Sequence, residues 1–174
     1  DMDSQNSKNH FSITIEVVPP AGPDTETLLN ALTGLSNLAI DGFSVASNPV
    51  AKPRMSAMAL CSQIQKTIKK PATLHCTTRD HNRLSLQGEL WGARSLGIET
   101  ILAATGDFVA LDDRKSTTTV RDVDVYGLVK MARDAGMQTG VVFDIHPEVN
   151  GLEPAVSHLE RKAAAGAQFA VTQP

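Results

Sequence analysis

The sequence has few of the features that mark specialised protein classes. Only two cysteines occur in 174 residues, Cys61 and Cys76, and they form no CxxC pair. This excludes a disulfide framework and predicts a reduced, cytoplasmic setting. No block of Lys or Arg is present and the net charge is −3, which disfavours a nucleic-acid partner. No apolar run approaches the ~18 residues of a membrane span.

The composition is otherwise that of an ordinary folded domain. Apolar residues make up 41% of the chain and charged residues 20%, which excludes a disordered chain and a coiled coil. Residues 1–10 read as a polar tail without the apolar segment of a signal peptide. Residues 11–174 read as one domain.

Six short apolar runs recur along this domain with little polar alternation. They lie at 13–18, 42–46, 72–76, 100–104, 139–143 and 168–172. Such runs are typical of parallel strands covered on both faces. Helical patterns separate them, predicted over 25–38, 57–69, 82–96, 125–135 and 154–165. The candidate capping residues are Asp24, Ser56, Asp80 or Asn82, and Asp122 or Asp124, and three of the patterns end at Gly.

The spacing of the runs predicts the architecture. Their centres recur every 28 to 40 residues, close to the ~31 residues per strand–helix unit of a (β/α)₈ barrel. The rival is a doubly wound open sheet, but its GxGxxG fingerprint is missing, as is GxxxxGK[ST]. We therefore predict an α/β fold, a TIM barrel of which about six βα units are present.

Polar side chains follow the predicted strands, where the enzymes of this fold carry their chemistry. The strand ends supply Glu16, Ser47, Asn48, His75, Thr77, Arg79, Asp80, Thr105, Gly106, Asp107, Asp144, His146, Glu148, Thr172 and Gln173. Carboxylates, imidazoles and amides from six separate elements are thus expected around one mouth. The longest polar loop, 108–121, follows the fourth strand on the same side.

Glu16 is the sharpest single signal because it interrupts an apolar strand. Burial disfavours the charged carboxylate, so the expected pKa is raised and Glu16 could donate a proton near neutral pH. The structural alternative is a Glu paired with Arg or Lys inside the barrel. Asp107 follows Thr105 and Gly106, where it offers a fixed negative charge to a ligand or simply caps a turn.

The histidines and Lys162 each leave two interpretations open. His75 stands alone in an apolar run, where a hydrogen-bonded core histidine is the ordinary outcome. His146 precedes Pro147 and Glu148, but no HxH or HExxH spacing supports a metal. A metal-dependent lyase or hydrolase using these two histidines, Glu16 and Asp107 remains an alternative. Lys162 is either a solvated cation at a helix end or a phosphate ligand.

Several stretches, in order and spacing, resemble the methylenetetrahydrofolate reductase family of flavoprotein barrels. They are Ile15–Pro20, His75–Asn82, Leu96–Ile98 leading into Leu102–Asp107, His146–Glu148, and the segment from Lys162 to Gln173. The Arg-Asp-His-Asn and Thr-Gly-Asp forms look most like the branch that can be joined to a homocysteine S-methyltransferase. The resemblance covers residues 11–174.

The resemblance implies a role for each site residue. The family carries FAD, passes a hydride to it from NADH or NADPH, and reduces methylenetetrahydrofolate to methyltetrahydrofolate. Glu16 matches its acid, Asp107 the residue that tunes the flavin and contacts folate, and Gln173 a folate ligand. The implied flavin contacts are His75, Thr105, Gly106, Asp107, Phe143, His146 and Lys162, with no metal.

The length suggests one more expectation. Six units leave an eight-stranded barrel unclosed, so the chain looks truncated after its sixth strand. The first and sixth strands would then expose edges, which invite pairing with a partner chain or a second copy. A non-catalytic barrel subunit acting through a partner is therefore a further alternative.

Overall fold

The computed structural model describes residues 11–144 and 151–173. Six strands form one parallel sheet: β1 (Thr14–Val17), β2 (Gly42–Val45), β3 (Ala72–Thr77), β4 (Thr100–Ala104), β5 (Gln138–Phe143) and β6 (Phe169–Thr172). The α-helices are α1 (Glu26–Leu35), α2 (Ala57–Ile68), α3 (Arg83–Ser95), α4 (Val125–Asp134) and α6 (Leu152–Ala164). Two 3₁₀ turns, η1 (Pro49–Ala51) and η2 (Leu111–Lys115), were not predicted.

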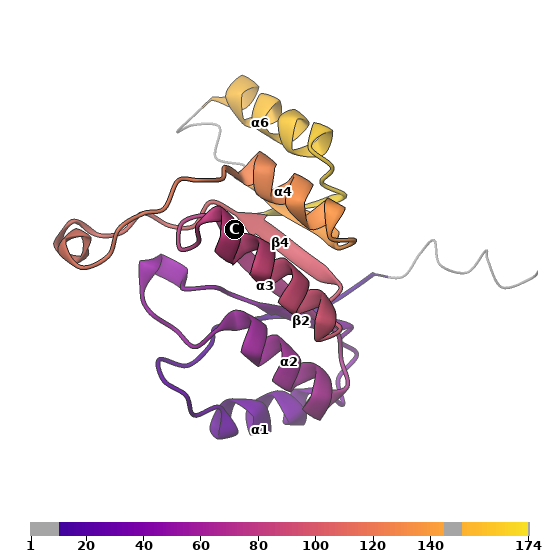
Figure 1. Cartoon of the computed structure of the whole chain (residues 1–174). Coiled ribbons are helices and arrows are strands. Elements are labelled where there is room, and N and C mark those ends of the chain that lie inside the picture. Colours follow the sequence, from indigo (N-terminus) through magenta and orange to yellow (C-terminus); the bar gives the residue numbers. More distant parts are fainter. Residues whose placement is uncertain (1–10, 145–150, 174) are drawn as a thin grey trace, which may run out of the picture.

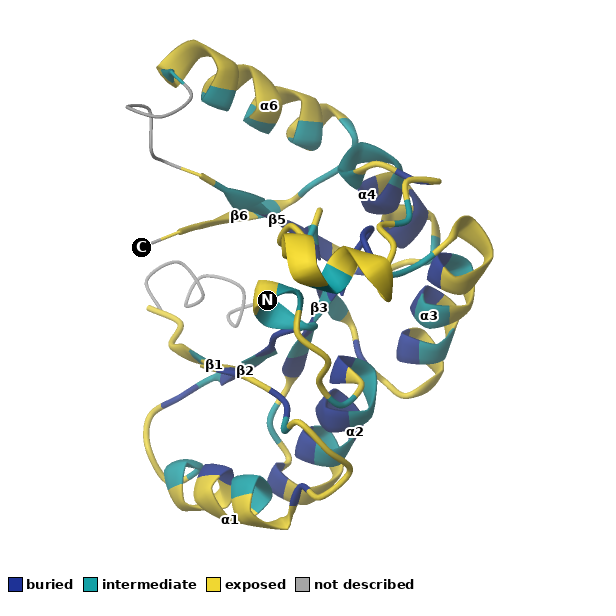
Figure 2. Ribbon diagram, turned by 90° about the vertical axis from the view of Figure 1, so that its left-hand side faces the viewer, coloured by how far each residue is buried: buried dark blue, intermediate teal, exposed yellow. Residues whose placement is uncertain are grey.

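The strand order confirms the barrel prediction. The six strands lie side by side in the order of the sequence, each parallel to the next. A doubly wound sheet would instead reverse its order at a switch point. The sheet is curled, and the helices form an arc on its outer side (Figures 1 and 2). The chain therefore forms part of a TIM-barrel-like fold, with β1 and β6 at the two edges.

Side-chain caps explain where three helices begin. Ser56 accepts a hydrogen bond from the Ala59 amide, Asn82 from Ser85 and Asp124 from Gly127, as their positions predicted. The first helix differs from the prediction. Its N-cap is Thr25 and not Asp24, and it ends at Leu35, three residues short of the predicted end.

The core lies between the sheet and the outer helices. The largest fully buried side chains include Phe43, Leu74 and Ile101 from strands, and Leu60, Ile64, Leu86, Leu90 and Leu128 from helices. Burial is much weaker at the sixth strand, because α6 holds no buried residue and most of β6 is exposed. Within the described ranges, no helix is both long and apolar enough to cross a membrane.

The long loop after β4 extends away from the sheet as an arm that carries η2 (Figure 1). An ion pair of 2.6 Å between Lys52 and Asp113 connects this arm to the loop after β2. That second loop is conformationally unusual, because Asn48, Val50 and Ala51 all have positive φ. Non-glycine residues rarely adopt this left-handed conformation, and they persist only where surrounding contacts hold them.

Candidate functional site

The carboxyl ends of the strands enclose a cavity of about 460 Å³, here called the mouth cavity. Its lining includes most of the site residues predicted from sequence: Glu16, His75, Thr105, Gly106, Asp107, Lys162 and Gln173. Leu102, Ala103, Val142 and Val171 add apolar surface. The topology thus brings together side chains that lie more than 150 residues apart in the sequence.

Among the described residues, one predicted site residue, Phe143, is not part of this lining. Phe143 lies on β5, but strand alternation turns its neighbours Val142 and Asp144 toward the mouth cavity. Val142 and not Phe143 therefore lines the mouth cavity. His146 lies outside the described residues.

Glu16 lies at the mouth cavity but is exposed, not buried as its apolar neighbours suggested. Val17 is buried and Ile15 packs against the core, so the outward face of β1 meets the helices. Glu16 projects from the opposite face, into the interior of the curled sheet, which is open at the mouth. The prediction of a buried carboxyl was therefore wrong, while its position at the strand end was right.

His75, on β3, lies near Glu16 at the mouth cavity. Its Nε2 shares a hydrogen bond of 2.7 Å with the hydroxyl of Ser44 on β2. Burial lowers the pKa of His75, and the nearby charge of Glu16 only partly opposes this. The imidazole is therefore neutral at pH 7 and presents one donor and one acceptor nitrogen.

Asp107 is held at the end of β4 by a contact with the loop after β2. Its Oδ2 accepts a hydrogen bond of 2.6 Å from the Val50 amide. Gly106 before it has a φ of 90° and lies against the side chain of Arg79. The carboxylate thus has a fixed place at the mouth cavity, with capacity to accept further hydrogen bonds.

A second cavity of about 530 Å³, the side cavity, adjoins the first and shares Thr105, Gly106, Asp107, Val125 and Lys162 with it. Its lining includes the cations Arg121, Arg161 and Lys162 besides the carboxylates of Asp107 and Asp124, while Arg79 is paired with Asp80. Lys162 donates a 2.6 Å hydrogen bond to the Val142 carbonyl, and burial lowers its pKa. The arrangement suits an anionic ligand that extends from one cavity into the other.

Three residues of the side cavity had no role in the sequence analysis. The Tyr126 hydroxyl lies 2.7 Å from His158 Nδ1, and the Arg161 guanidinium stacks 4.3 Å from the centre of the Tyr126 ring. Tyr126 is the single tyrosine of the chain. The spacing of His158 and Arg161, three apart on α6, was the available signal that both lie on one face.

The described residues support neither a reactive thiol nor a metal site. Burial raises the pKa of Cys61 and of Cys76 to about 12, so neither thiol is an activated nucleophile. Across residues 11–144 and 151–173, no three His, Cys, Asp or Glu side chains cluster as a metal site requires. The metal-dependent alternative therefore gains no support from the described part of the chain.

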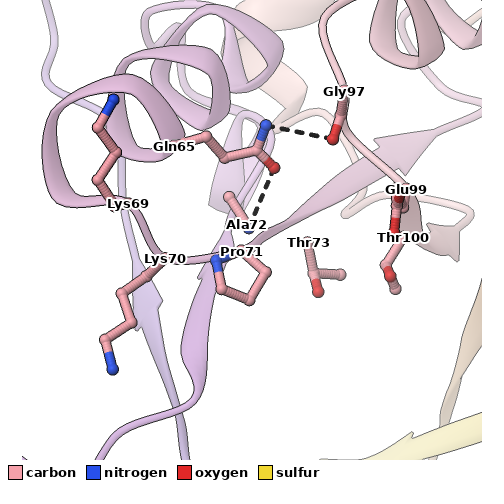
Figure 3. A pocket seen from close by; sticks show the side chains of 9 residues that line it. All are labelled: Gln65, Lys69, Lys70, Pro71, Ala72, Thr73, Gly97, Glu99 and Thr100. Atoms are coloured by element: carbon pink, nitrogen blue, oxygen red, sulfur yellow. Dashed lines mark hydrogen bonds between the residues drawn. The ribbon is translucent and has the colours of Figure 1, made fainter.

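A third cavity, of about 400 Å³, lies at the opposite, amino-terminal end of β3 and β4 (Figure 3). Gln65 spans it, donating to the Gly97 carbonyl and accepting from the Ala72 amide. Lys69 and Lys70 extend in opposite directions, and Lys70 donates to the Ile40 carbonyl. These contacts tie loops together at the end of the fold that serves stability and not catalysis.

Solved structures share the fold at low sequence identity. An uncharacterised protein from Clostridium thermocellum that binds two copies of 5-methyl-5,6,7,8-tetrahydrofolic acid superposes with a TM-score of 0.66. It is 14% identical, and the match covers 93% of this chain and 54% of that one. A phosphonopyruvate hydrolase superposes with a TM-score of 0.62 at 14% identity, covering 93% and 58%.

Relatives found by sequence are more similar to this chain than these structures are. The 5,10-methylenetetrahydrofolate reductase of Buchnera aphidicola is 26% identical over 170 residues, and that of Salmonella typhimurium 26% over 167 residues. These matches cover 97% and 95% of this chain but only 57% and 55% of the relatives, so the chain spans little more than half their length. The sequence model of methylenetetrahydrofolate reductase matches residues 1–174. The chain thus belongs to the methylenetetrahydrofolate reductase family.

Proposed function

We propose that the protein containing this chain reduces 5,10-methylenetetrahydrofolate to 5-methyltetrahydrofolate, with NADH or NADPH as hydride donor and FAD as carrier. The observation that carries the proposal is the gathering of Glu16, Asp107 and Gln173 around the mouth cavity. The similar curated relatives bear the name of this reductase, and a structural relative binds a methylated folate. Both lines support a folate substrate.

The residues at the two cavities suit FAD. The apolar strand ends Leu102, Ala103 and Val142 would carry the flat ring, and Arg161 and Lys162 would meet the diphosphate. Neutral His75 would offer the ring system a hydrogen bond. Bound there, FAD supplies the two-electron relay between nicotinamide and folate.

Glu16 is the proposed acid of the folate step. Opening the five-membered ring of methylenetetrahydrofolate requires a proton on the departing nitrogen, which leaves a reactive iminium carbon. The Glu16 carboxyl projects into the mouth cavity and is the proposed source of that proton. Exposure to the cavity lets it be reprotonated from solvent between turnovers.

Asp107 and Gln173 have binding and orienting roles in this proposal. The Asp107 carboxylate, fixed by the Val50 amide, accepts hydrogen bonds from N–H groups of the folate ring. The Gln173 amide, at the end of β6, both donates and accepts. Together they hold the substrate with its reacting carbon toward the floor of the mouth cavity, since positioning accounts for much of an enzyme's rate.

The test separates the two half-reactions in the intact purified protein. Glu16→Gln is expected to lower folate reduction at least ~100-fold, because a general acid contributes this much. Reduction of the flavin by the nicotinamide nucleotide should stay within about twofold, since it needs no proton from Glu16. Stopped-flow absorbance of the flavin measures both rates.

The matched control is Glu26→Gln, an exposed Glu on α1 outside both cavities. It should leave both half-reactions unchanged. A colourless wild-type protein that takes up no added FAD contradicts the proposed function. Equal loss of both half-reactions in Glu16→Gln contradicts the acid role alone.

We further propose that a second copy of this chain or a partner chain covers the edges at β1 and β6. Each of these strands pairs with one neighbour among the described residues, and an uncovered edge invites pairing. We also propose a cytoplasmic location, supported by two buried free thiols. The native mass of the intact protein tests the oligomer: a monomer excludes the second copy.

A further inference from the structure

We propose that Arg79 is a positioning residue that fixes Asp107 at the mouth cavity by holding both sides of its contact with Val50. This role rests on the proposed function, in which the Asp107 carboxylate binds folate and Arg79 sets the position of that carboxylate. Arg79 follows β3, and its side chain is only 3% exposed. A charged group this deeply buried requires partners for its donors.

The guanidinium has partners from three strand-end loops. Nε and Nη2 donate to the two carboxylate oxygens of Asp80 at 2.6 and 2.7 Å. Nη2 also donates to the Asn48 carbonyl after β2, and Nη1 to the Asp107 carbonyl after β4, both at 3.1 Å. Only the planar fork of an arginine can make this set, because a lysine ammonium is a single point of donation.

Asp80 balances the buried cation. Burial alone would raise the pKa of Asp80, but hydrogen bonds from Arg79 and from the Asn48 amide outweigh it and lower that pKa. The pair is therefore ionised at neutral pH. Since Arg79 donates to the backbone carbonyl of Asp107 and not to its carboxylate, it orients this residue without using up the acceptor that a ligand needs.

The second side of the contact is the unusual loop after β2. Asn48, Val50 and Ala51 have φ of 43°, 51° and 54°. Arg79 holds the Asn48 carbonyl, and the Asn48 side chain is itself tied to Asp80 and to the Arg54 amide. These contacts maintain a conformation that would otherwise relax. The conformation aims the Val50 amide at Asp107 Oδ2.

The turn before Asp107 packs closely against the Arg79 side chain. Gly106 has a φ of 90°, and a Cβ there would lie 3.1 Å from Arg79 Cβ and 3.3 Å from its Cζ. The Arg79 amide donates to the Thr105 carbonyl, and the Arg79 carbonyl accepts from Val120 on the returning arm. Arg79 thus joins the ends of β2, β3 and β4 to the base of the arm.

The first test compares Arg79→Lys with Asp107→Ala in the intact flavin-loaded protein. Arg79→Lys should slow the folate half-reaction at least ~10-fold, because misplacing a contact group by about 1 Å costs this much or more. The double variant should be no slower than about Asp107→Ala alone, because Asp107→Ala already removes the carboxylate that Arg79 positions. Arg94→Lys, on the exposed face of α3, is the control.

A merely structural role predicts a different pattern, in which the slowing by Arg79→Lys and the slowing by Asp107→Ala multiply in the double variant. That result would overturn the proposal. A second measurement needs no turnover: amide hydrogen exchange at Val50. Arg79→Lys should speed this exchange at least ~10-fold, while the sheet amides of Leu74 and Leu102 stay protected.

Unchanged exchange at Val50 would also refute the positioning role. This second measurement separates the two proposals. If the wild-type protein shows no folate turnover, the proposed function fails, whereas Val50 exchange still reports on what Arg79 does.

Discussion

The centre of the sheet and its flank are built differently, although both contribute to the mouth cavity. The centre consists of β2, β3 and β4 with α2 and α3, and its helices bury Leu60, Ile64, Leu86 and Leu90 completely. The flank consists of α6 and β6. No residue of α6 is buried, and Leu152 at its start is 63% exposed. Packing density, and with it local stability, is therefore unequal around the site.

The site residues are distributed over both regions. His75, Arg79 and Asp107 lie on the centre, where a dense core and a hydrogen-bond network fix them. Lys162 and Gln173 lie on the flank, where few contacts resist small shifts. The geometry that must be held before the ligand arrives is thus on the centre, and the groups that can adjust to the ligand are on the flank.

The largest expected effect comes from truncating one apolar side chain in each region. Leu90→Ala on α3 should cost about 3 kcal/mol of unfolding free energy, since it leaves a cavity in a core position that is fully buried. Val156→Ala on α6, where the side chain is 41% exposed, should cost less than about 1 kcal/mol. Urea unfolding of the intact protein measures both. Equal losses would show that the flank is packed as firmly as the centre.

A pair of glycine substitutions compares the packing of the two regions by adding a methyl group instead of removing side-chain atoms. A Cβ at Gly42 on β2 would lie 2.7 Å from the Pro71 carbonyl oxygen, a backbone atom that cannot move alone. A Cβ at Gly140 on β5 would meet the ring of Phe169, a half-buried side chain of β6. Gly42→Ala should cost about 2–3 kcal/mol and Gly140→Ala about 1 kcal/mol, because the Phe169 ring can turn away.

Thermal unfolding of the two glycine variants gives the comparison. A larger loss for Gly140→Ala than for Gly42→Ala would mean that Phe169 is held as rigidly as the backbone.

The smallest expected effect is a pH dependence of stability that belongs to the centre. The pKa of His75 is lowered in the folded state, so below its ordinary value of 6.5 the unfolded state binds more protons. The stabilisation from neutral His75 is therefore fully present above about pH 6.5 and is lost as the pH falls below that value. The melting temperature of His75→Gln should change less than that of the wild type over this range.

His158→Gln, which removes an imidazole from the flank, is the matched control for His75→Gln. If His75→Gln keeps the full wild-type pH dependence, the buried imidazole is not its source.

Periodicity and strand-end position predicted most of the fold and much of the site. The six apolar runs became six parallel strands, and the residues after them, from Glu16 to Gln173, meet at one cavity. These features follow from local pattern and from the geometry of a parallel sheet. The cap at Ser56 was predicted outright, and those at Asn82 and Asp124 were each one of two predicted candidates, because a cap depends on its own helix.

What the sequence could not supply depends on contacts between distant segments. Glu16 looked buried because its sequence neighbours are apolar, but exposure depends on the face it occupies and on the opening of the curled sheet. Val142 replaced Phe143 because the register of β5 decides which of two adjacent residues faces the mouth cavity. Tyr126 on α4 and His158 on α6 are hydrogen-bonded to each other, and no spacing in the sequence predicts that pairing.

The order of the strands has a consequence for how the polypeptide assembles as it is made. Each strand from β2 through β6 pairs with the strand synthesised just before it. Each new strand–helix unit closes a loop of roughly 30 residues, so the entropic cost of adding it hardly rises as the sheet widens. The sheet can therefore grow in the direction of translation, with each emerging strand meeting an edge that is already in place.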